Sequence, residues 1–286
     1  MPTTALLFVI VAAFAHSTWN LLAKRAAHNI HLIWFSSVAE ALLFGPVAVW
    51  LVIASWPELS LKAGLFLLAT GILHIIYTES LIRGYRVADF SIVYPLARGT
   101  GPFLAFFGAV FAMHEHLTLL AAAGAALITL GILIVSGGIA SLARRSRHEG
   151  VLWGIATGCV IASYTLVDAY SVKTLLVPPL LVEYSGNLFR AIVLSGSVKR
   201  YDTSLLREFR SCWKEALGIG LLTPLGYVLA LSAMRMAPVS HVAPVREISI
   251  MIGVFWGAKV FGEAQMRRRI TGSAFIVVGV AALAIR

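Results

Sequence analysis

The chain of 286 residues is 59% hydrophobic and only 13% charged, with a mean hydropathy of +0.87. Soluble domains carry about a quarter charged residues, so this composition excludes an ordinary soluble protein and indicates membrane-embedded helices. The net charge of +10 does not indicate nucleic-acid binding, because the basic residues lie in short loops between apolar runs. The two cysteines, Cys159 and Cys212, exclude a disulfide framework and lack metal-ligand spacing.

Ten segments are long and apolar enough to be membrane spans, since a crossing helix needs ~20 mostly apolar residues. They lie at 5–23, 31–53, 63–83, 90–112, 117–139, 151–172, 178–198, 215–235, 240–260 and 269–285. The first run could be a signal peptide cleaved at Ala13-Phe14-Ala15, but no basic residue precedes it and it has a counterpart in the second half. We therefore predict an all-α integral membrane protein with ten transmembrane helices.

The two halves of the chain repeat each other. Ser91, Val93 and Pro95 return 149 residues later as Ser240, Val242 and Pro244, and Glu115, Gly124 and Gly131 return 148 residues later as Glu263, Gly272 and Gly279. Five spans per copy force opposite insertion, so we predict a 5+5 inverted-topology repeat. Its parts are a first repeat at 1–143, a basic cytoplasmic linker at 144–150 and a second repeat at 151–286. The glycine-spaced spans 5 and 10 should pack the halves together or form a dimer seam.

Orientation follows from the Lys and Arg count in the loops. The loops after the odd-numbered spans hold 16, the opposite side holds 4, and Arg98, Arg190 and Arg246 lie inside spans. The positive-inside rule then places both termini on the outer, periplasmic side of a bacterial-type inner membrane. The segment 199–215 has Leu205, Leu206, Phe209 and Trp213 at helical spacing among basic residues. This favours a helix lying on anionic lipid over a regulatory or partner-binding element.

Polar residues inside the spans are the candidates for function. A charged group at mid-bilayer costs about 2.5–3.5 kcal/mol, so each needs a partner or a wet cavity. The candidates for substrate binding are Trp19, Asn20, His74, Tyr77, Tyr94, Arg98, Tyr164, Asp168, Tyr227, Arg246 and Glu247. His16 could carry a coupling proton or be a buried, hydrogen-bonded histidine. Pro95 and Pro244 each remove a backbone donor, which predicts a helix break at a gate or a simple kink.

Arg98 and Glu247 occupy equivalent positions in the two copies, 149 residues apart. Inverted symmetry would place them at equal depth across the centre, where they could offer a cation and an anion to a substrate. The alternative is that such charges only hold helices together as internal ion pairs. That alternative is open for Glu183 with Arg190, and it is favoured for Glu79 with Arg83 near a helix end.

No motif of a soluble enzyme is present: the chain has no phosphate-binding glycine loop, no His-Glu-x-x-His and no serine nucleophile elbow. His114-Glu115-His116 falls in a turn, and histidines two apart on a helix point to different faces. We expect no metal, no cofactor and no catalytic residue.

The order of these features resembles the drug/metabolite transporter superfamily, and most closely its EamA-type members. The resemblance is carried by the five-plus-five spans, the proline early in spans 4 and 9, and the glutamate-to-glycine stretches Glu115–Gly131 and Glu263–Gly279. The start Ala15-His16-Ser17-Thr18-Trp19-Asn20, followed by Lys24, is also similar to the family's first helix. The resemblance implies a carrier of small metabolites, amino acids or toxic organic compounds, with a central cavity lined by spans 1, 3, 4, 6, 8 and 9.

We therefore expect a secondary transporter that moves a small polar metabolite, amino-acid-like or an organic anion, by alternating access. Export is favoured over import on family grounds alone. Its partners would be the substrate, the lipid bilayer and a possible coupling proton, and it would act as a monomer or homodimer. One alternative is a non-transporting membrane sensor or subunit. Another is a membrane-embedded enzyme, but no two residues have the spacing expected of a general acid and base.

Overall fold

The computed structural model describes residues 2–55, 60–113, 119–136, 145–198, 204–236 and 245–284, and all regular structure in these ranges is α-helical. The helices are α1 (Thr3–Arg25), α2 (Leu32–Ser55), α3 (Leu61–Val87), α4 (Phe90–Met113), α5 (Leu119–Ser136), α6 (Arg145–Lys173), α7 (Pro179–Val198), α8 (Leu205–Met236), α10 (Ile248–Phe261) and α11 (Met266–Ala284). Each matches one predicted span, which confirms the all-helical fold.

Local signals set several helix ends. Ser60 precedes α3 and its hydroxyl accepts a hydrogen bond from the Ala63 backbone N–H at 3.2 Å, which satisfies a donor that the first turn leaves free. At its C-terminus, α10 ends at Gly262. The φ of this residue, 63°, is in the left-handed region, which glycine adopts without a Cβ clash.

The bounds depart from the prediction at α6 and α8. α6 begins at Arg145, inside the segment 144–150 that we assigned to a linker. α8 begins at Leu205 rather than 215, because the predicted surface helix continues into the span across a kink at Cys212 (φ −136°, ψ 15°). In that segment Leu206 and Trp213 are exposed, whereas Leu205 and Phe209 pack on the core. Pro244 lies outside the described residues.

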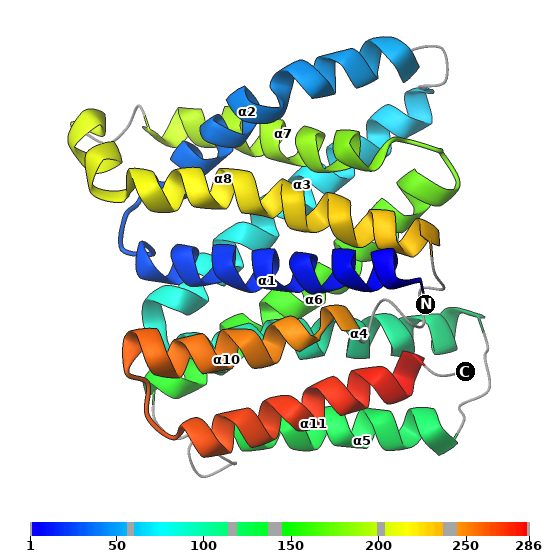
Figure 1. The fold of residues 1–286 in the computed structure, drawn as a ribbon, viewed down its shortest axis with the longest axis vertical. Helices are drawn as coiled ribbons and strands as arrows, with labels where there is room; N and C mark the ends of the chain where they lie inside the picture. The colour runs from blue at the N-terminus through cyan, green and yellow to red at the C-terminus, as the bar shows by residue number, and fades with distance from the viewer. Residues whose placement is uncertain are drawn as a thin grey trace.

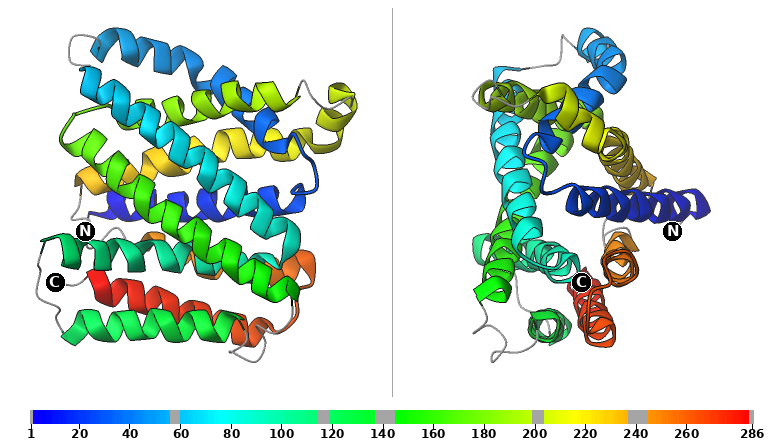
Figure 2. Two further views of the ribbon diagram at one scale, coloured as in Figure 1. Left: turned by 180° about the vertical axis from the view of Figure 1, so that it is seen from behind. Right: turned by 90° about the vertical axis from the view of Figure 1, so that its left-hand side faces the viewer.

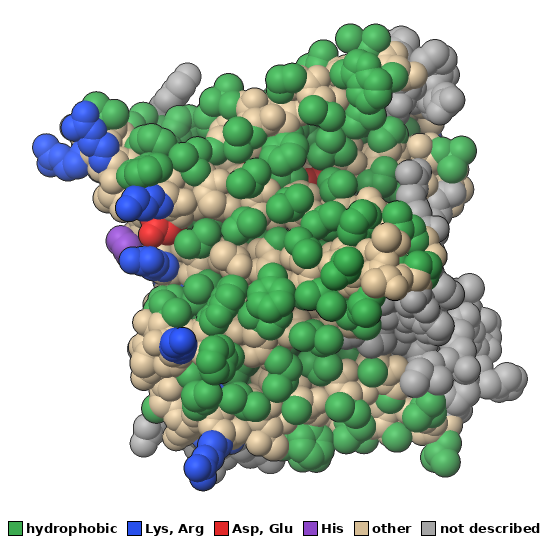
Figure 3. Space-filling model, viewed as in Figure 1, with side chains coloured by type: hydrophobic (Ala, Val, Ile, Leu, Met, Phe, Trp, Pro, Cys, Tyr) green, Lys and Arg blue, Asp and Glu red, His purple; other side chains and the backbone are tan. Residues whose placement is uncertain are grey.

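Four stretches of the described chain are long and apolar enough to cross a membrane: Thr3–Arg25, Leu32–Ala54, Leu61–Val87 and His148–Val172. The apolar helices Ala122–Val135 and Ile248–Phe261 are shorter. The outer surface is correspondingly apolar, with Leu42, Trp50 and Ile53 each at least 65% exposed (Figure 3). A surface of this kind suits contact with lipid rather than water. The full count of ten spans stays a prediction.

The helices run roughly side by side along one direction, and both termini lie at the same end of the molecule (Figure 1). α3 and α6 pack together across the back, and α1 packs against α8 on the opposite side (Figure 2). α4 and α10 lie next to each other between these layers and the pair α5 and α11. Side chains placed on α1, α4 and α10, or on α3, α6, α7 and α8, can therefore meet in the interior.

The seam between α5 and α11 joins the two halves of the chain at close range. A Cβ on Gly131 would lie 2.5 Å from the carbonyl oxygen of Gly272, and one on Gly279 would lie 2.7 Å from that of Gly124. Only residues without a Cβ allow the backbones to approach this closely. The expectation that these glycines pack the halves together is confirmed, and the seam lies within one chain.

Candidate functional site

Arg98 of α4 and Glu247, the residue preceding α10, form a direct ion pair. Arg98 Nη2 donates to Glu247 Oε1 at 2.8 Å, and both side chains are buried, Glu247 with only 1% of its surface exposed. Arg246 Nε donates to the same oxygen at 3.4 Å and is partly exposed. The two charges that we expected to share one site therefore meet, and each neutralises the other in the interior.

Several buried polar atoms around this pair have no hydrogen-bond partner among the described residues. They are Arg98 Nε, Glu247 Oε2 and His16 Nε2, and the buried Tyr94 and Ser249 hydroxyls beside them lie close enough to interact with each other. They come from α1, α4 and the start of α10, three elements in mutual contact. Buried polar groups are nearly always paired, so the unpaired atoms around this ion pair make it the candidate site for a polar ligand.

The predicted residues of α1 divide into two roles. The His16 ring lies 6.2 Å from the Tyr94 ring, centroid to centroid, and its Nδ1 accepts a hydrogen bond from Trp19 Nε1 at 3.3 Å. Asn20 instead accepts from the Tyr85 hydroxyl at 2.7 Å and so ties α1 to α3. His16 and Trp19 thus border the Arg98 site, whereas Asn20 acts as a structural link.

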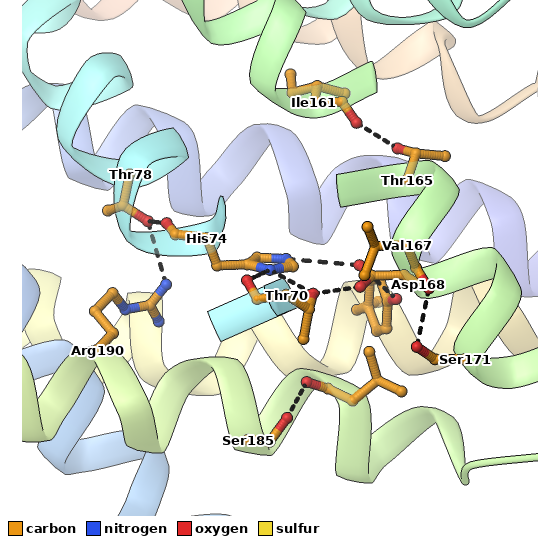
Figure 4. A network of polar contacts seen from close by, with 12 residues as sticks. Thr70, His74, Thr78, Ile161, Thr165, Val167, Asp168, Ser171, Ser185 and Arg190 are labelled. Carbon is orange, nitrogen blue, oxygen red and sulfur yellow. Dashed lines mark hydrogen bonds and ion pairs between the residues drawn. The ribbon is translucent and has the colours of Figure 1, made fainter. Parts of the chain in front are cut away.

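His74 of α3 and Asp168 of α6 are the centre of a second buried cluster (Figure 4). His74 Nε2 lies 3.9 Å from Asp168 Oδ2, and the Tyr227 hydroxyl of α8 donates to the same oxygen at 3.4 Å. The Thr70 hydroxyl donates to Asp168 Oδ1. The structure therefore brings together three of the predicted residues, His74, Asp168 and Tyr227, away from direct contact with Arg98.

Two tyrosines line the space next to this cluster. The Tyr164 ring stacks on His74 with centroids 4.5 Å apart, and Tyr77 meets Tyr164 edge-on at 5.4 Å. Both lie within electrostatic range of Arg98 as well as of the second cluster. The aromatic pair thus separates the two charged sites.

Arg190 of α7 is held by a polar network that we did not predict. It donates to Ser37 Oγ at 2.8 Å, to Thr78 Oγ1 at 3.2 Å and to Asn187 Oδ1 at 2.8 Å, and its Nη2 lies 3.8 Å from Glu40 Oε2. The proposed partner Glu183 is also buried, but no hydrogen bond or ion pair joins it to Arg190 in the described structure. The expected ion pair of Glu79 with Arg83 is present at 2.7 Å and half-exposed.

A third network closes the end of the molecule that carries the basic loops. The Glu263 carboxylate accepts from the backbone N–H groups of Phe90 at 2.7 Å and Ser91 at 3.0 Å, which caps the first turn of α4. Arg269 donates to Glu263 at 3.0 Å and also to Asp89. Arg269 is therefore buried, unlike the exposed loop residue that we counted for orientation.

Lys24 adds to this network. Its Nζ donates to the carbonyl oxygens of Tyr85 and Ala88, both at 2.6 Å, and so caps the last turn of α3.

Sequence reasoning missed Thr70, Ser37 and Ser249, which contact or border the predicted charged residues. Thr70, His74 and Thr78 are spaced i, i+4 and i+8 on one face of α3, a signal that could have found Thr70. Pro95 lies inside α4, which continues through it, so the expected helix break is not seen there. His114-Glu115-His116 lies outside the described residues, and the described ones contain no cluster suited to a metal ion.

Apolar membrane-length helices around a buried charged interior define a multi-pass membrane protein with an internal polar site. The model of the EamA-like transporter family matches residues 148–285, the second half of the chain. This match supports membership of the drug/metabolite transporter superfamily and suggests a membrane transporter of that type. The family's members are transporters rather than enzymes.

The fold is shared with a solved structure titled only "Crystal structure of protein". That structure is 16% identical, with a TM-score of 0.65, and the similarity covers 99% of this chain and 96% of the other. At this identity the similarity concerns the fold alone. No curated protein matches the chain.

Proposed function

We propose that the protein is a secondary active transporter that moves a small polar metabolite across the membrane by alternating access, with the Arg98–Glu247 pair at its substrate site. The observation that carries the proposal is this pair: a buried cation and anion, one from each half of the chain, ringed by unpaired polar atoms. A buried ion pair is weak evidence for stability, because its desolvation offsets its attraction, so a role in binding explains it better.

The unpaired atoms indicate the chemistry of the ligand. Arg98 Nε and the Tyr94 hydroxyl can donate hydrogen bonds, and His16 Nε2 also donates in the neutral ring because Nδ1 accepts from Trp19. Glu247 Oε2 can only accept when ionised. A ligand carboxylate would take the place of Glu247 on Arg98, and a ligand amine would meet the released Glu247. The substrate class is therefore an amino-acid-like molecule or an organic anion.

The packing supports an inverted repeat that could rock around this site. In such a repeat α1, α2, α3 and α4 correspond to α6, α7, α8 and α10. Three pairs of contacts follow this correspondence: α1–α8 with α6–α3, α2–α8 with α7–α3, and α10–α1 with α4–α6. Three further contacts, α2 with α7, α4 with α10 and α5 with α11, join helices that would be exchanged by the symmetry. Rocking of residues 1–143 against 151–286 would expose the pair to each side in turn.

Charge distribution supports the orientation. Lys and Arg side chains gather at the end of the molecule opposite the termini (Figure 3). With that end cytoplasmic, both termini face the outside of a bacterial-type inner membrane. The exposed Leu206 and Trp213 beside Arg207 and Arg210 would then rest on anionic lipid of the inner leaflet. Export is favoured on family grounds, and a monomer suffices because both repeats are in one chain.

The test is retention of metabolites by liposomes. Purified protein in liposomes is exposed to a whole-cell metabolite extract, and trapped compounds are identified by mass spectrometry. Empty liposomes and Arg98→Ala protein serve as comparisons. Arg83→Ala is the matched control, because Arg83 is exposed and its described contacts, the Glu79 carboxylate and the Trp153 ring, lie outside the site. A set of metabolites kept by wild type and Arg83→Ala, but lost with Arg98→Ala, supports the proposal.

Equal retention by wild type and empty liposomes would refute transport and favour a non-transporting sensor or subunit. Chemically altered metabolites in the wild-type sample would favour a membrane-embedded enzyme. Retention that survives Arg98→Ala would leave transport standing but remove the pair from the substrate site.

A further inference from the structure

The second cluster, around His74 and Asp168, has a chemistry unlike that of the Arg98 site. Figure 4 shows His74 on α3 and Asp168 on α6 pointing toward one another, with Thr70 between their polar atoms. Both are buried, and Asp168 holds 5% of its surface exposed. At the Arg98 site an arginine faces a carboxylate, whereas here the group that faces the Asp168 carboxylate is the His74 imidazole.

The hydrogen bonds fix where the imidazole holds its first proton. His74 Nδ1 lies 2.9 Å from the carbonyl oxygen of Thr70, which can only accept, so Nδ1 carries a hydrogen. The Thr70 hydroxyl donates its hydrogen bond to Asp168 Oδ1, and its oxygen can accept one from the same Nδ1 at 3.1 Å. In a neutral ring Nε2 is then a bare lone pair that faces Asp168 Oδ2 at 3.9 Å. Two acceptors facing each other repel, and one proton added to either of them removes this repulsion.

The charges of the surrounding helices call for the same proton. The titratable groups around the pair are Tyr77 on α3, Tyr164 on α6, Glu183 and Arg190 on α7, and Tyr227 on α8. Glu40 on α2 interacts in turn with Glu183 and Arg190. Arg190 is the one arginine of this set, against the carboxyl groups of Glu40, Asp168 and Glu183. An uncompensated buried carboxylate costs several kcal/mol, of the order found for unpaired ions in proteins, and protonation removes that cost.

Including the Arg98 site does not balance the charges. The charged residues of the two sites are the arginines Arg98, Arg190 and the partly exposed Arg246, and the acids Glu40, Asp168, Glu183 and Glu247. The acids exceed the arginines by one. One added proton makes this set of charges neutral, and the His74–Asp168 pair offers a place for it.

The donor pattern selects a proton over a metal cation. A cation such as Na⁺ or Mg²⁺ needs several free oxygen lone pairs converging on it. Around Asp168 the Thr70 hydroxyl and the Tyr227 hydroxyl donate to the carboxylate, and His74 is a nitrogen ligand aimed at it. Such surroundings suit a carboxylate that exchanges a proton with an imidazole.

We propose that His74 and Asp168 form a one-proton binding site that couples transport to the proton gradient, an inference that rests on the proposed transport function. A proton from one side of the membrane binds to the Nε2 lone pair of His74 and is shared with Asp168 Oδ2. It then leaves from Nε2 toward the opposite side. This assigns the coupling proton to His74 rather than to His16. A protonated His16 would face the cations Arg98 and Arg246, with Glu247 already bound to both of them.

The two sites can influence each other through the aromatic side chains between them. Tyr164 stacks on His74 and lies within electrostatic range of Arg98. A change of charge on the His74–Asp168 pair would therefore be felt by a ligand at Arg98 across one layer of rings, and α6 and α4, which carry Asp168 and Arg98, pack directly on each other.

One experiment tests the site without any transported substrate. NMR of the full chain with isotope-labelled histidine, in lipid nanodiscs, reports which ring nitrogens of His74 carry hydrogen from about pH 5 to about pH 8. His74→Gln assigns the signal. The proposal expects a change between the doubly protonated ring and the neutral Nδ1–H form, and loss of the doubly protonated form with Asp168→Asn. A neutral Nε2–H form, or a His74 signal unchanged by Asp168→Asn, overturns it.

A second experiment tests coupling. Liposomes containing the protein receive the metabolite extract with and without an imposed pH gradient, and a trapped pH dye follows proton movement. Wild type should accumulate metabolites several-fold with the gradient and move protons with them. Asp168→Asn should lose both. Thr165→Ala should keep both, because the Thr165 hydroxyl donates within its own helix, to the Ile161 carbonyl oxygen at 2.7 Å.

The outcomes separate the two proposals. Metabolite retention that ignores the pH gradient, or gradient-driven accumulation by Asp168→Asn equal to that of wild type, overturns proton coupling while transport stands. If wild type retains nothing under any gradient, the transport function itself fails and coupling with it, whatever His74 shows by NMR.

Discussion

The Arg98–Glu247 pair makes an asymmetric prediction for stability. Glu247 accepts from Arg98 at 2.8 Å and from Arg246 at 3.4 Å, whereas no other described carboxylate forms an ion pair with Arg98. Glu247→Gln therefore leaves two arginines without an anion, and we expect a loss of about 3–5 kcal/mol in the free energy of unfolding, as for a broken buried pair. Arg98→Met leaves Glu247 paired with Arg246 and should cost clearly less, about 1–3 kcal/mol.

The double variant Arg98→Met/Glu247→Gln should be less destabilised than the sum of the single variants, because it removes the stranded buried charge. The assay is equilibrium unfolding of purified protein in mixed micelles, run as a double-mutant cycle. Additive losses within about 0.5 kcal/mol, or a greater loss for Arg98→Met than for Glu247→Gln, would refute the reasoning.

Three further predictions concern other parts of the molecule. Gly131→Leu at the α5–α11 seam should lower the unfolding free energy by at least about 1–3 kcal/mol, since its Cβ meets a backbone oxygen at 2.5 Å. Glu263→Gln should cost about 1–3 kcal/mol in the same assay, because the carboxylate caps α4 and binds a buried arginine. Burial and nearby carboxylates raise the pKa of Cys212 to about 11. Maleimide should therefore label Cys212 slowly at neutral pH and faster as the pH approaches that value, because the thiolate is the reacting form.

Each of these has its control. Gly64→Ala places a Cβ where nothing lies within 4 Å and should be neutral or slightly stabilising, so equal losses at Gly64 and Gly131 would remove the close-packing argument. Glu79→Gln removes an exposed carboxylate and should change stability by less than about 1 kcal/mol. The labelling is read in Cys159→Ser protein, and rapid reaction at neutral pH would contradict the burial of Cys212.

The helices were predictable because their signal is local. A run of apolar residues about as long as the bilayer is thick forms a helix wherever it occurs, and each described helix lies on a predicted span. The glycine seam was predictable for a similar reason, since small residues at regular spacing on two spans leave the backbones free to approach. The start of α8 differs from the prediction because an amphipathic segment that precedes a membrane span can join that span through a kink.

Partners within the charged interior were only partly predictable. The equivalence of Arg98 and Glu247 under the repeat suggested their meeting, and the structure pairs them directly. Arg190 bonds to Asn187 on its own helix, but its other partners come from α2 and α3. Their approach depends on how the helices pack, so spacing along α7 pointed to Glu183 instead. Sequence spacing reports which residues share a helix face, but it does not report which helix that face meets.

The most direct test of the central claim is whether the Arg98–Glu247 site opens to each side of the membrane in turn. Ser249→Cys, beside the pair, is introduced into protein lacking Cys159 and Cys212, and an impermeant thiol reagent is applied to either side of oriented vesicles. Ser273→Cys is the control, because Ser273 is equally buried but lies on α11 outside the site. The account predicts labelling of Ser249→Cys from both sides, weakened by metabolite extract, and no labelling of Ser273→Cys. Labelling of Ser249→Cys from neither side, or from one side only, would contradict it.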